Sequence, residues 1–484
     1  MIVSRLVAGC RALLLAASVL IGPETGEAQH PLVWTPCGRH ECAWVSLSAD
    51  WEHPSSEQRS IALRRKLAAS ASRQIWLLPG GPGISGTRAL GQLMELMSSA
   101  LPDSDVYTLD ARGTGASGHL RCLAAEDPAS DGGKTLRASE LGDCLQSLSP
   151  ELGQHLHRFG ITTAARDLAH VIELQREPSK AVDIYADSAG ALWLQRLLVL
   201  HPDIADAVVM EAYVPVDFSA KTIDETAEEA LQRLLQICLQ TPQCSGQLPD
   251  PGAYSPELWS RIERGHCAAL NLSVNEIQRK LFEMLASSKS FSDVPALLSR
   301  LDRCSATDLP WLTSRLGAAS KLPAAIDLMP KFSEVIYQLI TASELWEDQT
   351  ILSEQAYQEH VAALASAGML GHAAQGAATS AVLSRWPRYA DPLDGVWPNT
   401  AVPMLILHGE LDPRIHNRAA SSARDHYKQP QQHYVSFPYS PHDVLGSTMT
   451  RRGDCASTLL IAFLRAPRAP LDTSCLSELS PITW

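Results

Sequence analysis

Residues 184–198 read IYADSAGALWLQRLL, and the interpretation of the whole chain starts from this stretch. The apolar pair Ile184-Tyr185 is followed by small residues around Ser188, and a helical pattern then begins. Small residues two places before and two places after a serine allow a sharp turn that exposes its hydroxyl oxygen. The stretch therefore predicts a strand, a tight turn that presents Ser188 and a helix. A serine that only caps a helix is the alternative.

Most of the chain alternates between strand-like and helical patterns in the same way. Alternation of this kind indicates a mostly parallel sheet with helices covering both faces. The expected strands are 44–47, 75–78, 106–109, 181–186, 207–210, 404–407 and 434–437, and the expected helices are 89–97, 163–174, 189–200, 418–427 and 456–464.

Residues 217–400 break this alternation. Leu, Ile and Ala recur there at helical spacing with almost no strand signal, which indicates an all-helical insertion. We therefore expect an α/β core whose first part is 29–216 and whose second part is 401–484, with the insertion between them.

The first 28 residues are expected to be a signal peptide. Arg5 and Arg11 precede the apolar run 12–22, and small residues at 26 and 28 predict cleavage after Ala28. A lipoprotein anchor at Cys10 is the alternative, but the apolar segment before it is short. No later run reaches the roughly 18 apolar residues of a membrane span, so we expect an exported protein, periplasmic or secreted, without stable membrane insertion.

Cysteine usage agrees with export. The chain has 11 cysteines, and those other than Cys10 fall into sequence neighbours, which in an exported chain indicates disulfides. The rival interpretation, a metal site, lacks any CxxC motif or Cys/His cluster. The expected pairs are Cys37/Cys42, Cys122/Cys144, Cys238/Cys244, Cys267/Cys304 and Cys455/Cys475.

The charge balance argues against a nucleic-acid partner. Lys and Arg number 40 against 53 Asp and Glu, which gives a formal charge of −13. No basic run is long enough to follow a phosphate backbone.

An acid and a histidine follow two later strands. Asp412 comes shortly after the expected strand 404–407, and His442 comes shortly after 434–437. Ser188, Asp412 and His442 thus occur in the order found in α/β-hydrolases, each past a strand end. A neutral imidazole accepts the serine proton and the carboxylate holds its tautomer. Alone, Asp412 could be a turn residue and His442 a surface residue, but the shared order and placement favour catalysis.

The loop PGGPG at 79–83 follows the strand 75–78. Acyl transfer develops an oxyanion, and this fold offers one N–H from the residue after the nucleophile, here Ala189, and a second from a glycine-rich loop. Pro82 has no N–H, so Gly81 is the expected second donor. A plain Gly-Pro turn is the alternative.

Together these motifs resemble the secreted tripeptidyl aminopeptidase and proline iminopeptidase family of α/β-hydrolase serine peptidases. The resemblance covers most of residues 35–480 and is weak over the insertion, which would form a helical cap at 217–400. It implies a serine exopeptidase that acts on free peptide N-termini without a metal or other cofactor. It is carried by the loop 80–83, the turn 110–115 with Ser117, the segments 195–196 and 201–203 after Ser188, the turn 409–413 and the Cys455 to Cys475 tail.

Three positions depart from the family pattern. Ala186 stands where the elbow usually has glycine, and Ala189 stands where an aromatic residue is frequent. Pro79 replaces the histidine usual in proline iminopeptidases, which favours the tripeptidyl branch.

A peptidase of this kind needs a carboxylate for the substrate's α-ammonium group. Glu344 is the candidate because SELW at 343–346 resembles the amine-binding stretch of the family, although acidic residues on cap helices are often only solvated. Glu211 and Glu410 are further candidates to line the pocket, and Glu211 is also a candidate backup acid. The expected substrate is a peptide or a small acyl compound. A carboxylesterase or small-amide hydrolase, and a catalytically inactive binding protein, are the alternatives.

Overall fold

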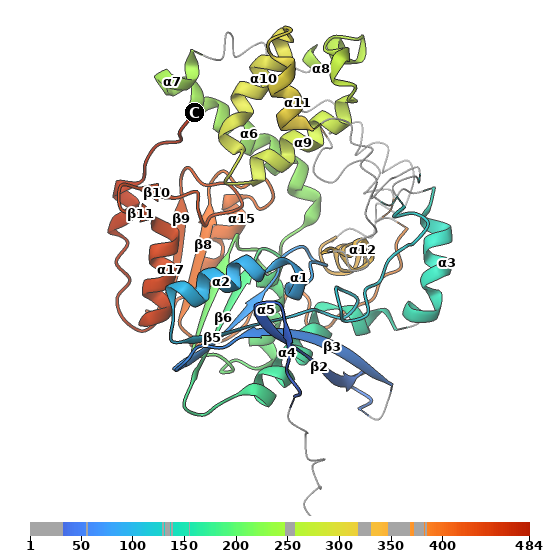
Figure 1. The fold of residues 1–484 in the computed structure, drawn as a ribbon, viewed down its shortest axis with the longest axis vertical. Helices are drawn as coiled ribbons and strands as arrows, with labels where there is room; N and C mark the ends of the chain where they lie inside the picture. The colour runs from blue at the N-terminus through green and yellow to red at the C-terminus, as the bar shows by residue number, and fades with distance from the viewer. Residues whose placement is uncertain are drawn as a thin grey trace, which may run out of the picture.

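The computed structural model describes residues 32–54, 57–127, 130, 136, 139–153, 155–246, 257–317, 331–346, 368–371, 382 and 385–484 (Figure 1). The expected signal peptide at 1–28 lies outside the described residues.

A nine-stranded sheet forms the centre of the molecule, in the order β1-β2-β3-β5-β4-β6-β7-β8-β9. The strands from β4 to β9 run parallel, whereas β1, β2 and β3 pair antiparallel at one side. Their bounds are β1 Thr35–Cys37, β2 His40–Ser48, β3 Gln58–Lys66, β4 Arg73–Leu78, β5 Ser104–Leu109, β6 Ala181–Asp187, β7 Ala207–Glu211, β8 Met404–Gly409 and β9 Gln432–Phe437. The predicted α/β-hydrolase fold is confirmed by this order.

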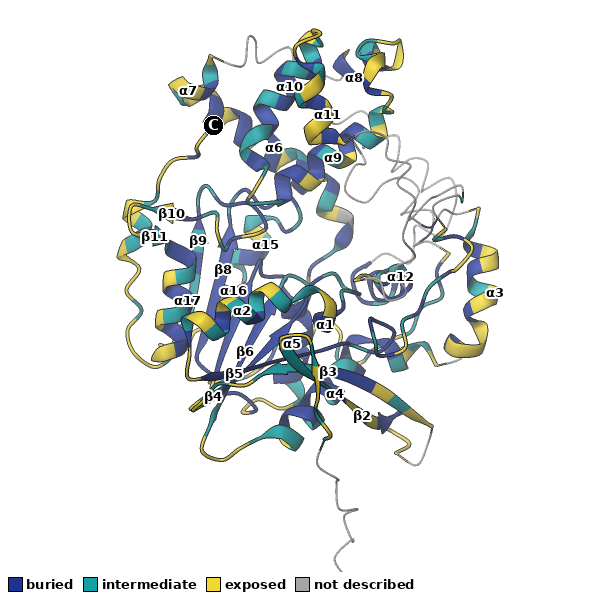
Figure 2. Cartoon of the chain, in the orientation of Figure 1, coloured by how far each residue is buried: buried dark blue, intermediate teal, exposed yellow. Residues whose placement is uncertain are grey.

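Helices cover both faces of the sheet. Side chains of β4 alternate between them: Ile75 and Leu77 pack with α2 and α17, whereas Trp76 and Leu78 pack with α4 and α5. These helices and their neighbours are α1 Gly86–Ala89, α2 Gly91–Ala100, α3 Leu141–Leu152, α4 Ile161–Gln175, α5 Gly190–Leu200, α15 Asn417–Ser421, α16 Ala423–His426 and α17 Cys455–Arg465. The central strands β4 to β8 are largely dark blue in Figure 2 because both faces of the sheet are covered there.

The described residues between β7 and β8 form helices and connecting loops, as predicted for the insertion, with an isolated β-bridge at Phe332. Their helices are α6 Ile223–Gln240, α7 Pro242–Ser245, α8 Glu257–Glu263, α9 Val274–Ala286, α10 Val294–Arg303, α11 Leu309–Leu316 and α12 Glu334–Glu344. Helices α6 to α11 gather above the sheet (Figure 1) around an apolar core of their own, whereas the apolar face of α12 joins the core beneath. The boundaries at 216 and 400 stay predictions.

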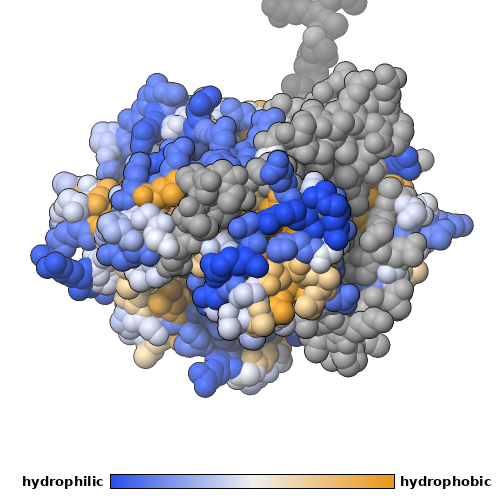
Figure 3. All heavy atoms as spheres, turned by 90° about the horizontal axis from the view of Figure 1, so that it is seen from above, coloured by the Kyte–Doolittle hydropathy of each residue, from blue (hydrophilic) through white to orange (hydrophobic). Residues whose placement is uncertain are grey.

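The five predicted cysteine pairs are confirmed, because the structure joins the same partners. A small hairpin, β10 Met449–Thr450 and β11 Gly453–Asp454, precedes α17. None of the helices in the described ranges is both long and apolar enough to cross a membrane. Seen from above, the described surface is largely hydrophilic with scattered apolar areas (Figure 3).

Candidate active site

Ser188 occupies a strained turn between β6 and α5. Its φ of 51° is in the left-handed region, which non-glycine residues rarely adopt. Its N–H donates to the Glu211 carbonyl oxygen at 2.9 Å, which fixes the turn to the neighbouring strand β7. Ala186 is fully buried and pairs in register with Leu78 of β4. Backbone strain held in this way is typical of functional positions.

The start of α5 packs directly on the end of β4. A Cβ at Gly190 would lie 2.8 Å from the Pro79 carbonyl oxygen and 2.9 Å from that of Leu78. Only glycine fits at this separation, so Gly190 is what brings Ala189 beside the loop 79–83.

The structure brings the three predicted catalytic side chains together. His442 Nε2 lies 2.9 Å from Ser188 Oγ, and His442 Nδ1 lies 2.7 Å from Asp412 Oδ2. Asp412 and His442 are buried, and Ser188 is partly exposed. Both distances are in the range of hydrogen bonds, so a proton can pass from the serine to the imidazole.

The second carboxylate oxygen of Asp412 is also held. Its Oδ1 accepts hydrogen bonds from the N–H groups of Arg414 at 2.7 Å and Ile415 at 3.1 Å. Burial by itself would raise the pKa of Asp412, but His442 and these hydrogen bonds outweigh it and the pKa is lowered. Burial would likewise lower the pKa of His442, but the Asp412 carboxylate outweighs it and raises the pKa. The pair therefore favours an ionised acid and a basic imidazole.

The predicted oxyanion loop lies against the nucleophile. A Cβ at Gly80 would lie 3.0 Å from the Ser188 Cβ, which shows how closely the loop approaches the serine. In the part of the chain that the structure describes, neither the Gly81 N–H nor the Ala189 N–H donates a hydrogen bond. Both donors are therefore available to a substrate, and their role as the oxyanion hole stays a prediction.

A short strand-like pairing joins the end of this loop to residues 331–333. Ser333 N donates to the Gly83 carbonyl oxygen at 2.9 Å, and Ser85 N donates to the Lys331 carbonyl oxygen at 2.8 Å. The segment 331–333, which leads into α12, is thus tied to the loop that approaches Ser188.

Glu211 lies beneath the nucleophile turn. Its carboxylate accepts hydrogen bonds from the Tyr185 hydroxyl and from Leu445 N, the latter at 2.7 Å. Burial, with the nearby Asp187 carboxylate, raises its pKa to about 7. Glu211 therefore ties β6 and β7 to the segment after His442, and no hydrogen bond joins it to the catalytic side chains among the described residues.

Glu410 points from the acid turn toward the helical insertion. It pairs with Arg233 of α6 at 2.6 Å and accepts a hydrogen bond from Ser436 Oγ at 3.1 Å. Its position joins two parts of the molecule, and its use as a substrate ligand stays a prediction.

Glu344 is buried at the end of α12 with both carboxylate oxygens engaged. Oε1 accepts hydrogen bonds from Ile161 N at 3.0 Å and from the Tyr389 hydroxyl, and Oε2 contacts Arg196 at 3.1 Å. Burial raises its pKa to about 7, against the effect of Arg196. None of these partners is Ser188 or a catalytic side chain. Arg196 is shared with Asp391 and Asp394 and lines a small pocket together with Glu344, so the use of Glu344 as an amine ligand stays a prediction.

Asp187 is the site residue that sequence reasoning missed. A point at the Cβ position of Gly80 lies 3.2 Å from Asp187 Oδ2 and 3.0 Å from the Ser188 Cβ. Burial raises the pKa of Asp187 to about 6, against the effect of His442. The signal was present in the sequence, because an acidic residue directly before a nucleophile is carried into the site by the same turn.

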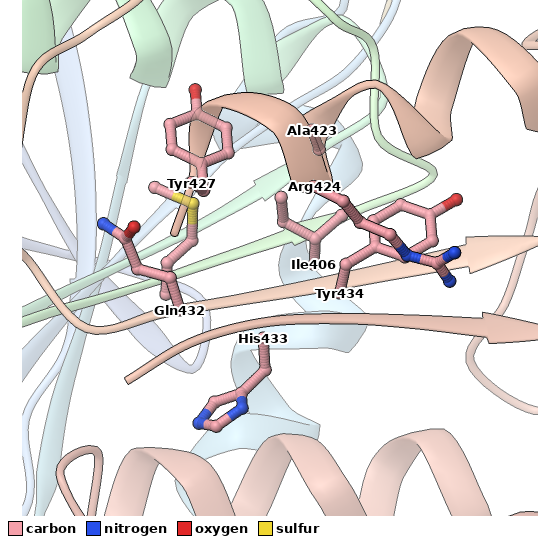
Figure 4. A pocket seen from close by; sticks show the side chains of 8 residues that line it. Ile406, Ala423, Arg424, Tyr427, Gln432, His433 and Tyr434 are labelled. Carbon is pink, nitrogen blue, oxygen red and sulfur yellow. The ribbon is translucent and has the colours of Figure 1, made fainter. Parts of the chain in front are cut away.

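The described residues contain no group of three or more His, Cys, Asp or Glu side chains arranged to hold a metal ion. A separate pocket lies between β8, β9 and α16 and is lined by Arg424, Tyr427 and Tyr434, among others (Figure 4). No catalytic side chain lines it.

A scan against protein-family models and a search of curated proteins found no match. Solved structures that are similar include proline iminopeptidase from Mycobacterium smegmatis, at 12% identity over 88% of this chain and 98% of that chain, with a TM-score of 0.38. Potato epoxide hydrolase I is 14% identical over 88% of this chain and 99% of its own, with a TM-score of 0.39. Epoxide hydrolase A from Mycobacterium thermoresistibile is 16% identical over 89% of this chain and 100% of its own, with a TM-score of 0.36. These values assign no reaction and no substrate to the chain.

Proposed function

We propose that this protein is an exported serine aminopeptidase that releases residues or tripeptides from free peptide N-termini through an acyl-enzyme. The observation that carries the proposal is the continuous path from Ser188 Oγ through His442 to Asp412, at 2.9 and 2.7 Å. Export is supported by the five disulfides, because such bonds persist in oxidising compartments.

The chemistry follows from the positions of these groups. Ser188 Oγ attacks the scissile carbonyl carbon while His442 accepts the hydroxyl proton, and the oxyanion forms where the Gly81 and Ala189 N–H groups can stabilise it. The C–N bond then breaks, and His442 protonates the leaving amine. Water attacks the ester to Ser188 by the reverse proton transfers and releases the acyl residue.

A carboxylesterase or small-amide hydrolase is the alternative. One observation favours it: Glu344, the predicted amine ligand, already contacts a cation, Arg196, which it shares with Asp391 and Asp394. A serine triad does not itself distinguish amides from esters, so the recognition of the amine must decide between the two functions.

A substrate panel tests the proposal. We expect alanyl-p-nitroanilide, Ala-Ala-Ala-p-nitroanilide or both to be hydrolysed at least tenfold faster, in kcat/KM, than the N-acetylated form, because acetylation removes the cation that an aminopeptidase binds. p-Nitrophenyl acetate reports the esterase activity on the same protein. Equal activity on free and blocked peptides, or activity on the ester alone, contradicts the aminopeptidase function.

A further inference from the structure

We propose that the Asp187 carboxylate binds the α-ammonium group of the residue whose carbonyl Ser188 attacks, so that the enzyme releases single N-terminal residues. This inference rests on the proposed function, and it names the part of the substrate that the site recognises. It assigns to the nucleophile turn a role that the sequence resemblance gave to Glu344 on α12.

The first step is the position of the carboxylate. Asp187 Oδ2 and the Ser188 Cβ lie 3.2 and 3.0 Å from one point beside Gly80, so the two atoms are about 6 Å apart or closer. Asp187 is partly exposed, whereas its neighbours on β6 are buried. The carboxylate therefore lies at the end of β6, beside the nucleophile and Gly80 of the loop that faces it.

The second step is that the carboxylate has no hydrogen-bond donor of its own. Within the described ranges no side chain or N–H group donates to Asp187, although Glu211, Glu344 and Glu410 all have donors. A partly buried carboxylate without a donor gains more from a cationic ligand than a solvated one does.

The third step is the charge around Asp187. The charged and titratable groups that act on it include Tyr185, His442, Asp412, Asp443, Glu211 and Arg414. Three of them are carboxyl groups. The guanidinium group of Arg414 lies 4.8 Å from the Phe282 ring of α9 and forms no ion pair within the described residues. His442 and Arg414 act on Asp187 as cations against these three carboxyl groups, but within the described residues neither of them contacts its carboxylate directly, so the carboxylate is open to a cationic ligand.

The fourth step is the distance that a peptide imposes. Within one residue the α-nitrogen lies about 2.5 Å from the carbonyl carbon, because only Cα separates them. In a tripeptidyl substrate the ammonium group lies two residues further away, about 7 Å more in an extended chain. A carboxylate within about 6 Å of the Ser188 Cβ fits the first distance and not the second.

The test compares two substrates that differ only in the ammonium group. The selectivity ratio is kcat/KM for alanyl-p-nitroanilide divided by kcat/KM for propanoyl-p-nitroanilide, in which hydrogen replaces the ammonium group. We expect Asp187→Asn to lower this ratio by about 10- to 150-fold, the range of a charge-assisted hydrogen bond. Because the ratio compares two substrates on one protein, a general loss of folding or of turnover cancels. Asp187→Glu should recover part of the ratio by restoring the charge.

Asp203→Asn is the matched control. Asp203 is an exposed carboxylate in the loop after α5, so its variant removes the same charge away from the site and should leave the ratio unchanged. An unchanged ratio in Asp187→Asn, or a loss of ratio in Glu344→Gln instead, overturns the proposal. Hydrolysis of Ala-Ala-Ala-p-nitroanilide without any hydrolysis of alanyl-p-nitroanilide also overturns it.

A measurement on the unmodified enzyme covers the case in which the variants do not fold. Propylammonium should inhibit p-nitrophenyl acetate hydrolysis competitively, at least tenfold more strongly than propanol, because only the cation pairs with Asp187. Equal inhibition by the two compounds contradicts the proposal. Failure of the proposed function gives a different result from failure of this inference. A selectivity ratio near one in the wild type contradicts the aminopeptidase function. A high wild-type ratio that Asp187→Asn retains contradicts only the role of Asp187.

Discussion

At the scale of single residues, the contacts of a side chain decide its role more than its sequence context does. Glu344 lies in a stretch that resembles an amine site, but the Arg196 guanidinium and the Ile161 N–H occupy its oxygens. Asp187 lies in the turn that the sequence identified, yet the pattern drew attention only to the serine. The role of each carboxylate depends on which residues pack against it in the folded chain, and sequence spacing does not show those contacts.

The raised pKa of His442 predicts how the activity depends on pH. His442 must be neutral to accept the Ser188 proton, and the Asp412 carboxylate raises its pKa above the usual 6.5 in spite of burial. For p-nitrophenyl acetate, which does not titrate, kcat/KM should therefore be low at acid pH and rise with a midpoint above 6.5. Protonation of His442 removes the catalytic base, so the enzyme is active at pH values above the midpoint.

The pH profile also has a control variant. Asp412→Asn removes the charge that raises the His442 pKa, so the midpoint should move to lower pH while the maximal rate falls by roughly 10⁴-fold. A wild-type midpoint below 6.5, or a midpoint that Asp412→Asn does not move, contradicts the assignment of His442 as the base.

At the scale of elements, the site depends on how closely α5 approaches β4. A Cβ at Gly190 would lie only 2.8 Å from the Pro79 carbonyl oxygen, which is too close for a side chain. Gly190→Ala should push the start of α5 away and separate the Ala189 N–H from the Gly81 loop. Loss of one oxyanion donor typically costs about 10²- to 10³-fold in kcat, and we expect a loss of that size in steady-state kinetics.

Gly142→Ala provides the comparison. Gly142 is exposed on α3, and a Cβ there would meet nothing within 4 Å, so the same chemical change should leave kcat unchanged. Replacing a glycine within a helix should also stabilise the fold by up to about 1 kcal/mol. Full activity of Gly190→Ala would mean that the approach of α5 to β4 does not position the donors.

The elements that were predicted are those with strong apolar patterns. All seven expected strands occur, and six of them are parallel and largely buried strands, which read as apolar runs. The strand β3, QRSIALRRK, was missed because charged residues occupy both of its ends. The single helix expected at 418–427 is instead two short helices, α15 and α16, separated at Ser422.

At the scale of the whole molecule, the helical insertion contacts the two loops that carry the acid and the histidine. Glu229 Oε2 of α6 lies 2.6 Å from His416 Nε2. Asp443 N donates to the carbonyl oxygen of Ala286 in α9 at 3.1 Å. With the contact between Arg233 and Glu410, these interactions join α6 and α9 to both loops. The break in the alternating pattern at 217–400 predicted an insertion, but these contacts join segments that are distant in the sequence, so no local pattern predicts them.

The central claim is that Ser188 is the nucleophile, and labelling with a fluorophosphonate tests it most directly. The wild-type protein should gain one phosphonyl group, and peptide mass spectrometry should locate it on Ser188, since only an activated serine attacks this reagent at a useful rate. Ser188→Ala should remain unlabelled while its circular dichroism matches that of the wild type. A phosphonyl group on another residue, or a folded wild-type protein that takes up none, would contradict the account.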